Sequence, residues 1–200
     1  MAARRLDADE RRAQIVALAR RLFADGGYRT TTTRELAREA GVSDALMYRH
    51  FASKEDVLRA VVDQGIAGFA AMGPTASAGR ELPLPERLRV LGRTFIDTLD
   101  AEADLLMLFA AEHRLLADDE RLVTFIDLAA SGLAAELAAR AEAGDVRGDL
   151  DGYVFARSFM GALVAFVLLQ RMLGMDRVHP MDPDHYLAEL VEVYVRGARP

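Results

Sequence analysis

The apolar residues of this chain recur at the spacing of an α-helix along almost all of its 200 residues. In the first example, Ile15, Leu18, Ala19, Leu22 and Phe23 stand at i, i+3, i+4, i+7 and i+8, so they share one helical face. Valine and isoleucine are scattered at the same helical spacing and do not alternate with polar residues as in a half-buried strand. The pattern therefore predicts an all-α protein.

Glycines and capping residues divide this pattern into successive helices. Thr32, with Glu35 three residues later, is a capping-box signature for a helix that stops at Gly41. Ser43 can cap the next helix, and a segment rich in Gly, Pro, Ser and Thr over 73–85 predicts a loop. We expect a first helix that ends at Gly26, followed by helices over about 32–41, 44–50, 53–72, 85–100, 103–116, 119–143, 151–173 and 183–197.

The charges are unevenly distributed along the chain, which has a formal net charge of −6. Residues 1–62 carry 12 basic and 9 acidic side chains, whereas residues 63–200 carry 13 basic and 22 acidic ones. Such asymmetry hints at a nucleic-acid or membrane contact made by the basic end, although ordinary scatter accounts for it equally well. Lys54 is the only lysine among the 25 basic residues.

The segment from Thr32 to Phe51 has the arrangement of a helix-turn-helix, because it joins two short helices through a tight turn. Gly41 can adopt the positive φ that the turn needs, and Ala37 is small where the two helices cross. The outward face of the second helix can then enter a DNA major groove. The hydroxyl, imidazole and ammonium groups around it suit phosphate oxygens.

Residues 33–58 resemble the TetR-type transcriptional regulators, and the resemblance extends over about residues 9–69. It rests on Thr33, the Ala-Gly-Val-Ser run that ends at Ser43, the Tyr-Arg-His-Phe run that ends at Phe51, and Lys54 with the following Glu. The chain departs from the family pattern at Met47, where leucine is common, and at positions 44 and 45. An acidic residue at position 44 is unfavourable beside DNA unless it accepts a hydrogen bond from a cytosine amino group.

The resemblance implies which residues contact DNA. Those expected at phosphates are Thr31, Thr32, Thr33, Ser43, Tyr48, His50 and Lys54. Those expected to face base edges are Arg34, Asp44, Ala45, Leu46 and Arg49. The residues alone leave open three plainer roles: a core aromatic for Tyr48, a packing histidine for His50 and a solvated charge for Lys54.

The C-terminal helices carry apolar stripes that suit either a plain core or a dimer interface. Residues 159–169 are apolar on every side, which indicates burial on more than one face. Leu187, Leu190, Val191 and Tyr194 share one face of the last helix. Because helix-turn-helix proteins usually read paired half-sites as two-fold dimers, we expect a homodimer.

A ligand pocket is expected between the helices of residues 85–173. Large apolar side chains are plentiful there, and polar residues inside apolar runs point to a ligand, although pairing or solvent contact also explains them. The candidate lining residues are Phe95, Met107, Phe109, His113, Phe125, Arg157, Phe159, Phe166 and Gln170.

The sequence contains no motif typical of an enzyme or a metal site. The sequence has no G-x-S-x-G, G-x-G-x-x-G, P-loop or H-E-x-x-H motif, so no catalytic residue is expected. It has no cysteine, and His179 and His185, with Asp182 and Asp184 between them, fit helix caps better than a metal site, so no metal or cofactor is expected. The uncharged run over 158–170 is shorter than the roughly 20 residues of a membrane span, which favours a cytoplasmic protein.

These observations predict a three-helix DNA-binding domain over 9–69, with its helix-turn-helix at about 32–51. A helical effector-binding and dimerisation domain is expected over 84–200. As the resemblance implies, the function would be sequence-specific transcriptional regulation, with repression at a pseudo-palindromic operator relieved by a small, mostly apolar ligand. The alternative is an architectural or cell-division accessory DNA-binding protein of the same fold, without such an effector.

Overall fold

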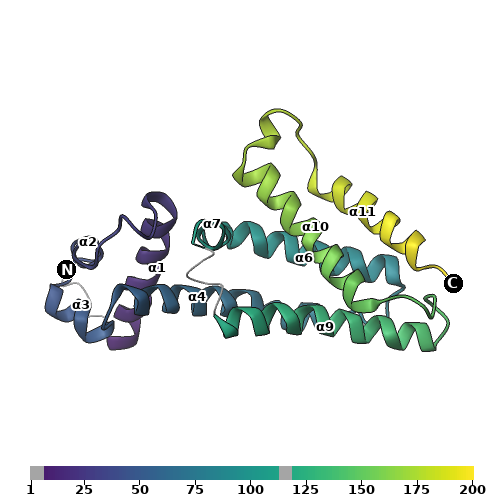
Figure 1. Cartoon of the computed structure of the whole chain (residues 1–200), viewed down its shortest axis with the longest axis horizontal. Helices are drawn as coiled ribbons and strands as arrows, with labels where there is room; N and C mark the ends of the chain where they lie inside the picture. The colour runs from purple at the N-terminus through teal and green to yellow at the C-terminus, as the bar shows by residue number, and fades with distance from the viewer. Residues whose placement is uncertain (1–6, 113–118) are drawn as a thin grey trace, which may run out of the picture. The chain divides into compact units, whose positions relative to one another are not determined.

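The structure, a computed structural model, describes residues 7–112 and 119–200 and is all-α, as the sequence predicted (Figure 1). Within those ranges the chain forms helices and turns and no strand. It divides into two compact units. The first contains Met1–Ala67 and Asp104–Asp118, and the second contains Gly68–Ala103 and Asp119–Pro200.

The first unit is built on the helix-turn-helix segment and the helices around it. Its helices are α1 (Ala8–Gly26), α2 (Thr33–Glu39), α3 (Asp44–His50), most of α4 (Lys54–Ala70) and most of α7 (Ala103–Ala111). The predicted caps are present: Thr32 Oγ1 accepts a hydrogen bond from Glu35 N at 3.1 Å, and Ser43 Oγ accepts one from Leu46 N at 3.2 Å.

Helices α4 and α7 approach each other closely inside the first unit. A Cβ atom built at Gly65 would lie 1.8 Å from Leu105 Cδ2, so only glycine fits at this point of α4. Leu105 and Leu108 of α7 are buried, as are Val61 and Val62 of α4. The predicted domain boundaries follow chain order, whereas the structure groups the described residues 104–112 with the N-terminal helices.

The second unit is a helical bundle. It contains α5 (Gly73–Ser77), α6 (Leu84–Ala101), α9 (Glu120–Glu142), α10 (Gly152–Val167), the π-helical turn η1 (Leu168–Met172), the short η2 (Met175–Arg177) and α11 (Pro183–Ala198). Helix α10 packs against α9, α6 and α11, and α11 also packs against α6 (Figure 1). The short helix α5 falls in the segment that the sequence predicted as a loop.

A buried ionic cluster braces one part of this bundle. Arg87 of α6 donates from Nε and Nη2 to the carboxylate of Glu136 on α9, and Arg140 donates to the same carboxylate. The two arginines also donate to the backbone carbonyls of Ala78 and Leu82. The cluster thus fixes the connection between α5 and α6 to α9.

Two helices, Glu120–Glu142 and Gly152–Met172, are long and apolar enough to cross a membrane by length and composition alone. A buried core helix passes the same test. The second of them, α10 with η1, buries Phe155, Phe159 and Phe166 in contact with its neighbouring helices. We therefore interpret it as a core helix of the bundle.

Candidate nucleic-acid interface

Helices α2 and α3 form the helix-turn-helix, and α2 also packs against α1. Gly41 makes the turn with a φ of 65°, in the left-handed region that favours glycine, as predicted. Leu36 and Met47 are fully buried on the inner faces of the two helices. The outer faces are left accessible. We call their exposed and half-exposed residues the helix-turn-helix face; they are Thr32, Thr33, Arg34, Ser43, Asp44, Ala45, Tyr48 and Arg49.

Arg49 is the cation that α3 offers outward. It is exposed and forms no hydrogen bond or ion pair within the part of the chain that the structure describes. A guanidinium has five N–H donors in a rigid fork, which matches the O6 and N7 acceptors of guanine in the major groove. Arg49 therefore has the chemistry for base recognition and is not held by an internal partner.

The helix-turn-helix face also carries hydroxyl groups. The Tyr48 hydroxyl, on a side chain that is 55% exposed, lies 3.4 Å from Thr33 Oγ1. The exposure of Tyr48 answers the alternative that it is a core aromatic. Thr32 and Ser43 use their oxygens as acceptors in helix caps, which leaves each hydroxyl proton for a phosphate oxygen.

Arg34 and Asp44 form an ion pair that joins the start of α2 to the start of α3, with 3.7 Å between Arg34 Nε and Asp44 Oδ2. Both side chains are exposed. The negative charge of Asp44, which is unfavourable beside DNA, is thus paired with the positive charge of Arg34 on the same face. Ala45 is exposed, whereas Leu46 and His50 are half-buried at the edges of α3.

Two residues expected at phosphates have other contacts in the structure. Thr31 is buried, and its hydroxyl donates to the carbonyl of Gly27 at 3.0 Å. Lys54 Nζ donates to the carbonyls of Tyr28 at 2.9 Å and Thr31 at 3.0 Å. Both side chains therefore hold the turn between α1 and α2. Sequence reasoning missed this role because the acceptors are backbone atoms more than 20 residues from Lys54.

Sequence reasoning also missed the acidic and aromatic partners of this turn. The Tyr28 hydroxyl donates to Glu55 at 3.1 Å, and burial, aided by this hydrogen bond, raises the pKa of Tyr28 to about 12. Arg29 lies 3.6 Å from the buried carboxylate of Glu112 at the end of α7. Glu112 follows an apolar run in the sequence, but nothing there indicates its partner, which stands 83 positions away.

The predicted ligand-pocket residues fall into three groups. Phe95 and Phe125 both contact Phe69, with ring centroids 6.2 and 5.9 Å apart, and form one aromatic cluster. Phe159 and Phe166 instead pack against tyrosines of α11, so we leave these two out of the proposed pocket. The remaining predicted residues are Met107 and Phe109 in the first unit, exposed Arg157 and buried Gln170 in the second, and His113, which lies outside the described residues.

Gln170 differs from the other candidates because its amide oxygen is buried without a hydrogen-bond partner. It lies in the π-helical turn η1, and such turns are frequent at functional sites. A buried unpaired acceptor is costly unless a ligand or water satisfies it. This is the observation that best supports a polar contact for a bound molecule.

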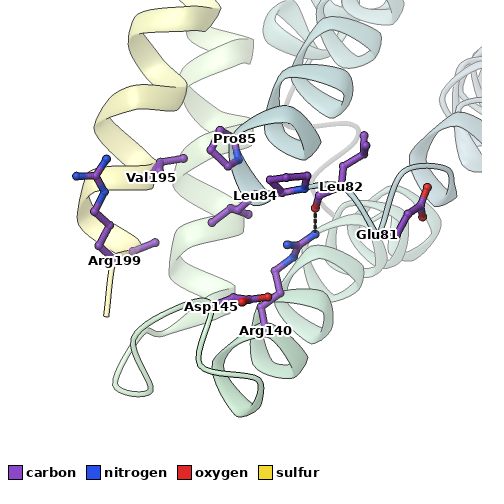
Figure 2. A pocket seen from close by; sticks show the side chains of 10 residues that line it. Glu81, Leu82, Leu84, Pro85, Arg140, Asp145, Val195 and Arg199 are labelled. Carbon is purple, nitrogen blue, oxygen red and sulfur yellow. Dashed lines mark hydrogen bonds between the residues drawn. The ribbon is translucent and has the colours of Figure 1, made fainter.

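A hollow of about 390 Å³ lies elsewhere in the second unit, at the ends of α9 and α11 (Figure 2). Its lining includes Leu82, Arg140, Asp145 and Arg199, and Arg140 donates to the Leu82 carbonyl. None of the predicted pocket residues that the structure describes lines it. Because its buried arginine is already satisfied by Glu136 and by carbonyls, we assign no ligand to it.

The predicted helix caps near the C-terminus are confirmed. Asp182 accepts a hydrogen bond from His185 N at 2.9 Å at the start of α11, and Asp151 caps α10. Asp184 pairs with Arg93 of α6 at 2.9 Å. Among the described residues, no group of three or more His, Asp or Glu side chains is arranged to hold a metal ion.

Comparison with known proteins supports the helix-turn-helix assignment. Residues 15–61 match the family model described as bacterial regulatory proteins, tetR family. The HTH-type transcriptional regulator HbdR of Aromatoleum sp. (strain CIB) is 33% identical over 115 residues, which cover 58% of this chain and 50% of HbdR. The chain thus spans about half the length of the curated relatives that it matches.

Solved structures share the fold along nearly the whole chain. FadR from Bacillus subtilis, in complex with stearoyl-CoA, has a TM-score of 0.71 at 19% identity, over 94% of this chain and 99% of that one. AibR, in complex with isovaleryl coenzyme A and operator DNA, has a TM-score of 0.70 at 23% identity, over 92% and 97% of the two chains. The helix-turn-helix geometry and the match over residues 15–61 together assign this segment of the chain to the tetR family of bacterial regulatory proteins.

Proposed function

We propose that this protein is a sequence-specific DNA-binding transcriptional regulator that acts as a repressor. The observation that carries the proposal is the exposed guanidinium of Arg49 on α3, which has no partner among the described residues and shares the helix-turn-helix face with the hydroxyl groups of Thr33 and Tyr48. The guanidinium reads base edges, and the hydroxyls bind phosphates and fix the register of the helix in the groove. Similarity to curated relatives supports this role, because they include proteins named as an HTH-type transcriptional regulator and an HTH-type transcriptional repressor.

The protein acts as a homodimer through α10 and α11. Exposed residues along one face of α10 and the following turn η1 are small or apolar; they are Val154, Ser158, Gly161, Ala165 and, in η1, Leu169. On α11, Val193 is 66% exposed. Small side chains allow two helices to approach closely, and a two-fold pair would present two copies of α3 to a pseudo-palindromic operator.

A small, mostly apolar effector binds in the second unit. The cluster of Phe69, Phe95 and Phe125 supplies aromatic surface from three helices, and none of these three rings is fully buried. Gln170 supplies an acceptor in need of a partner. The complexes of FadR with stearoyl-CoA and of AibR with isovaleryl coenzyme A support a ligand with an apolar portion.

The effector changes DNA affinity through helices that carry residues of both units. Helix α4 begins at Lys54 in the first unit and continues past Ala67 into the second. Most of helix α7 belongs to the first unit, although in the sequence it stands between two segments of the second unit. A ligand shifts DNA affinity only by its differential affinity for two conformations, and a coupling of about 1–3 kcal/mol lowers operator affinity about 5- to 150-fold.

We place this regulator in the cytoplasm, with the DNA that it binds, and assign it no catalytic reaction. The test is selection of bound duplexes from a random-sequence pool. Enrichment of a pseudo-palindrome whose half-sites are about one helical turn, or a small multiple, apart is the expected result. Binding without enrichment would favour the architectural alternative, and a failure to retain any duplex would overturn the proposal.

A further inference from the structure

Lys54 has an unusual environment for a residue at the start of a helix beside a DNA-binding motif. Its Nζ donates to three backbone carbonyls, those of Tyr28 at 2.9 Å, Thr31 at 3.0 Å and Arg29 at 3.4 Å. An ammonium has three N–H donors and no acceptor, so these contacts use its full donor capacity.

Aromatic and acidic neighbours complete the enclosure of the ammonium. Lys54 Nζ lies 4.2 Å from the centroid of the Tyr28 ring, at cation–π distance. The Tyr28 hydroxyl donates to Glu55, the residue that follows Lys54, at 3.1 Å. The Tyr28 ring also packs edge-on against Phe23 of α1 at 5.1 Å. Lys54 is therefore bound into a fixed structure and does not extend into solvent.

The three carbonyls belong to the turn that leads directly into α2. Thr31, whose carbonyl Lys54 holds, is followed by Thr32, the N-cap of α2, and by Thr33 of the helix-turn-helix face. The turn starts at Gly27, whose φ of 86° is in the left-handed region. Besides Lys54, this turn is held by the Thr30 and Thr31 hydroxyls, which donate to the Gly27 carbonyl, and by the Tyr28 ring packed against Phe23.

We propose that Lys54 is a positioning residue for DNA binding, and that its charge holds the turn over 28–31 so that α2 and Thr33 meet the DNA backbone in register. This inference rests on the proposed DNA-binding function. It departs from the phosphate contact that the family resemblance implied for Lys54. If the ammonium moved to a phosphate, three backbone carbonyls would lose their hydrogen-bond donor. Two of these hydrogen bonds, to Tyr28 and Thr31, are partly buried, so their loss would destabilise the turn.

The two roles differ in how DNA binding depends on salt. A cation that binds a phosphate releases a counterion, so its removal lowers the slope of log affinity against log salt concentration by about 0.9. A positioning residue releases none. Its removal should weaken binding at every salt concentration and leave the slope unchanged.

The experiment compares the wild-type protein with Lys54→Met, whose side chain is unbranched and of similar length but carries no charge. Fluorescence anisotropy measures binding to a mixed-sequence duplex about three helical turns long, over a range of potassium chloride concentrations. We expect Lys54→Met to bind about tenfold more weakly, with the wild-type slope, at a temperature where circular dichroism shows it folded. Arg147→Gln is the matched control: it removes an exposed positive charge, paired with Asp149 in the second unit, and should change neither the affinity nor the slope.

Hydrogen exchange in the DNA-free protein provides the second measurement. Amides over 28–33 should exchange faster in Lys54→Met than in wild type, while those of α11 should not change. If Lys54→Met does not fold, Lys54→Gln replaces it, because a neutral amide can still donate two hydrogen bonds to the carbonyls.

The outcomes are distinguishable. A slope lowered by about 0.9 in the folded variant would make Lys54 a phosphate ligand and overturn the proposal. Unchanged affinity of the folded variant would reduce Lys54 to a purely structural residue and overturn it as well. A wild-type protein that binds no duplex would overturn the proposed function, whereas the exchange of residues 28–33 would still show whether Lys54 holds the turn.

Discussion

Arg34 and Asp44 face each other across the helix-turn-helix, with 3.7 Å between Arg34 Nε and Asp44 Oδ2. The two side chains are 87% and 54% exposed, so the pair contributes little to stability, since exposed pairs give about 0.2–1 kcal/mol. Its effect lies in the charge of the surface instead. The carboxylate neutralises one of the cations on the helix-turn-helix face.

We expect Asp44→Asn to strengthen binding to mixed-sequence duplex DNA and to steepen its salt dependence. The change frees Arg34 for a phosphate and removes a negative charge from the interface, which adds about one released counterion. A salt titration by fluorescence anisotropy checks this. Asp149→Asn is the matched control, because Asp149 forms a similar exposed pair with Arg147 in the second unit. Weaker binding by Asp44→Asn would instead indicate that Asp44 accepts a hydrogen bond from a base.

Arg49→Ala should reduce discrimination between the selected operator and a mutated site by about 1–3 kcal/mol, the range for a good bidentate base contact. The free guanidinium on α3 is the physical reason. Competition binding with single-base operator variants locates the base pair concerned. Arg38→Ala serves as control, since Arg38 is exposed on α2 but pairs with Glu35 and Glu39. An equal loss on every sequence would make Arg49 a phosphate contact.

Val193→Asp should convert the dimer into a monomer without loss of helical content, because it places a charge on the exposed face of α11. Sedimentation velocity at micromolar concentration measures the change. Val123→Asp, at another exposed valine on α9, should leave the dimer intact. Tyr194, on the same helix, is unsuitable for this test because its ring packs edge-on against Phe155 and Phe159 in its own chain. A monomeric wild type would contradict the interface.

Glu136→Gln should lower the free energy of unfolding by about 3–5 kcal/mol, because it leaves the buried guanidinium of Arg87 without a counter-charge. Arg87 and Glu136 side chains are only 3% and 9% exposed, so solvent screens the pair very little. Urea unfolding gives the value. Asp97→Asn, which breaks the exposed pair with Arg93, should cost less than about 1 kcal/mol. Similar costs for the two variants would contradict the burial argument.

Gln170→Leu should stabilise the ligand-free protein and abolish effector binding. A buried acceptor without a partner costs about 1–3 kcal/mol, and leucine removes it. Thermal shift measures both effects: a higher melting temperature without ligand, and no further increase with hydrophobic compounds that stabilise wild type. Gln64→Leu, on the exposed side of α4, is the control. A destabilised variant that still binds these compounds would show that Gln170 belongs to the core.

Local features of this protein could be read from its sequence. The caps at Thr32, Ser43 and Asp182 were predicted correctly because each joins a side chain to a backbone N–H three residues away. The left-handed turn at Gly41 follows from the same short range. Periodicity within each helix likewise predicted the all-α fold, since it requires only that residues three and four apart share a face.

Contacts between distant segments were decided by the tertiary structure. Lys54 reads as a surface cation because its acceptors are carbonyls 23 to 26 positions earlier, and backbone acceptors have no residue signature. Arg87 and Glu136 are 49 positions apart on separate helices, and nothing in either helix marks them as partners.

The sequence by itself determined most of the helices, their caps and the helix-turn-helix, because these depend on hydrogen bonds and apolar spacing within a few residues. Only the tertiary structure decided which polar groups are used up inside the molecule and which are left for a partner. It assigned Lys54 to a turn, left Arg49 free at the surface and left the amide oxygen of Gln170 buried and unpaired. The reason is that a side chain's availability depends on every group packed around it, and these groups come from all parts of the chain.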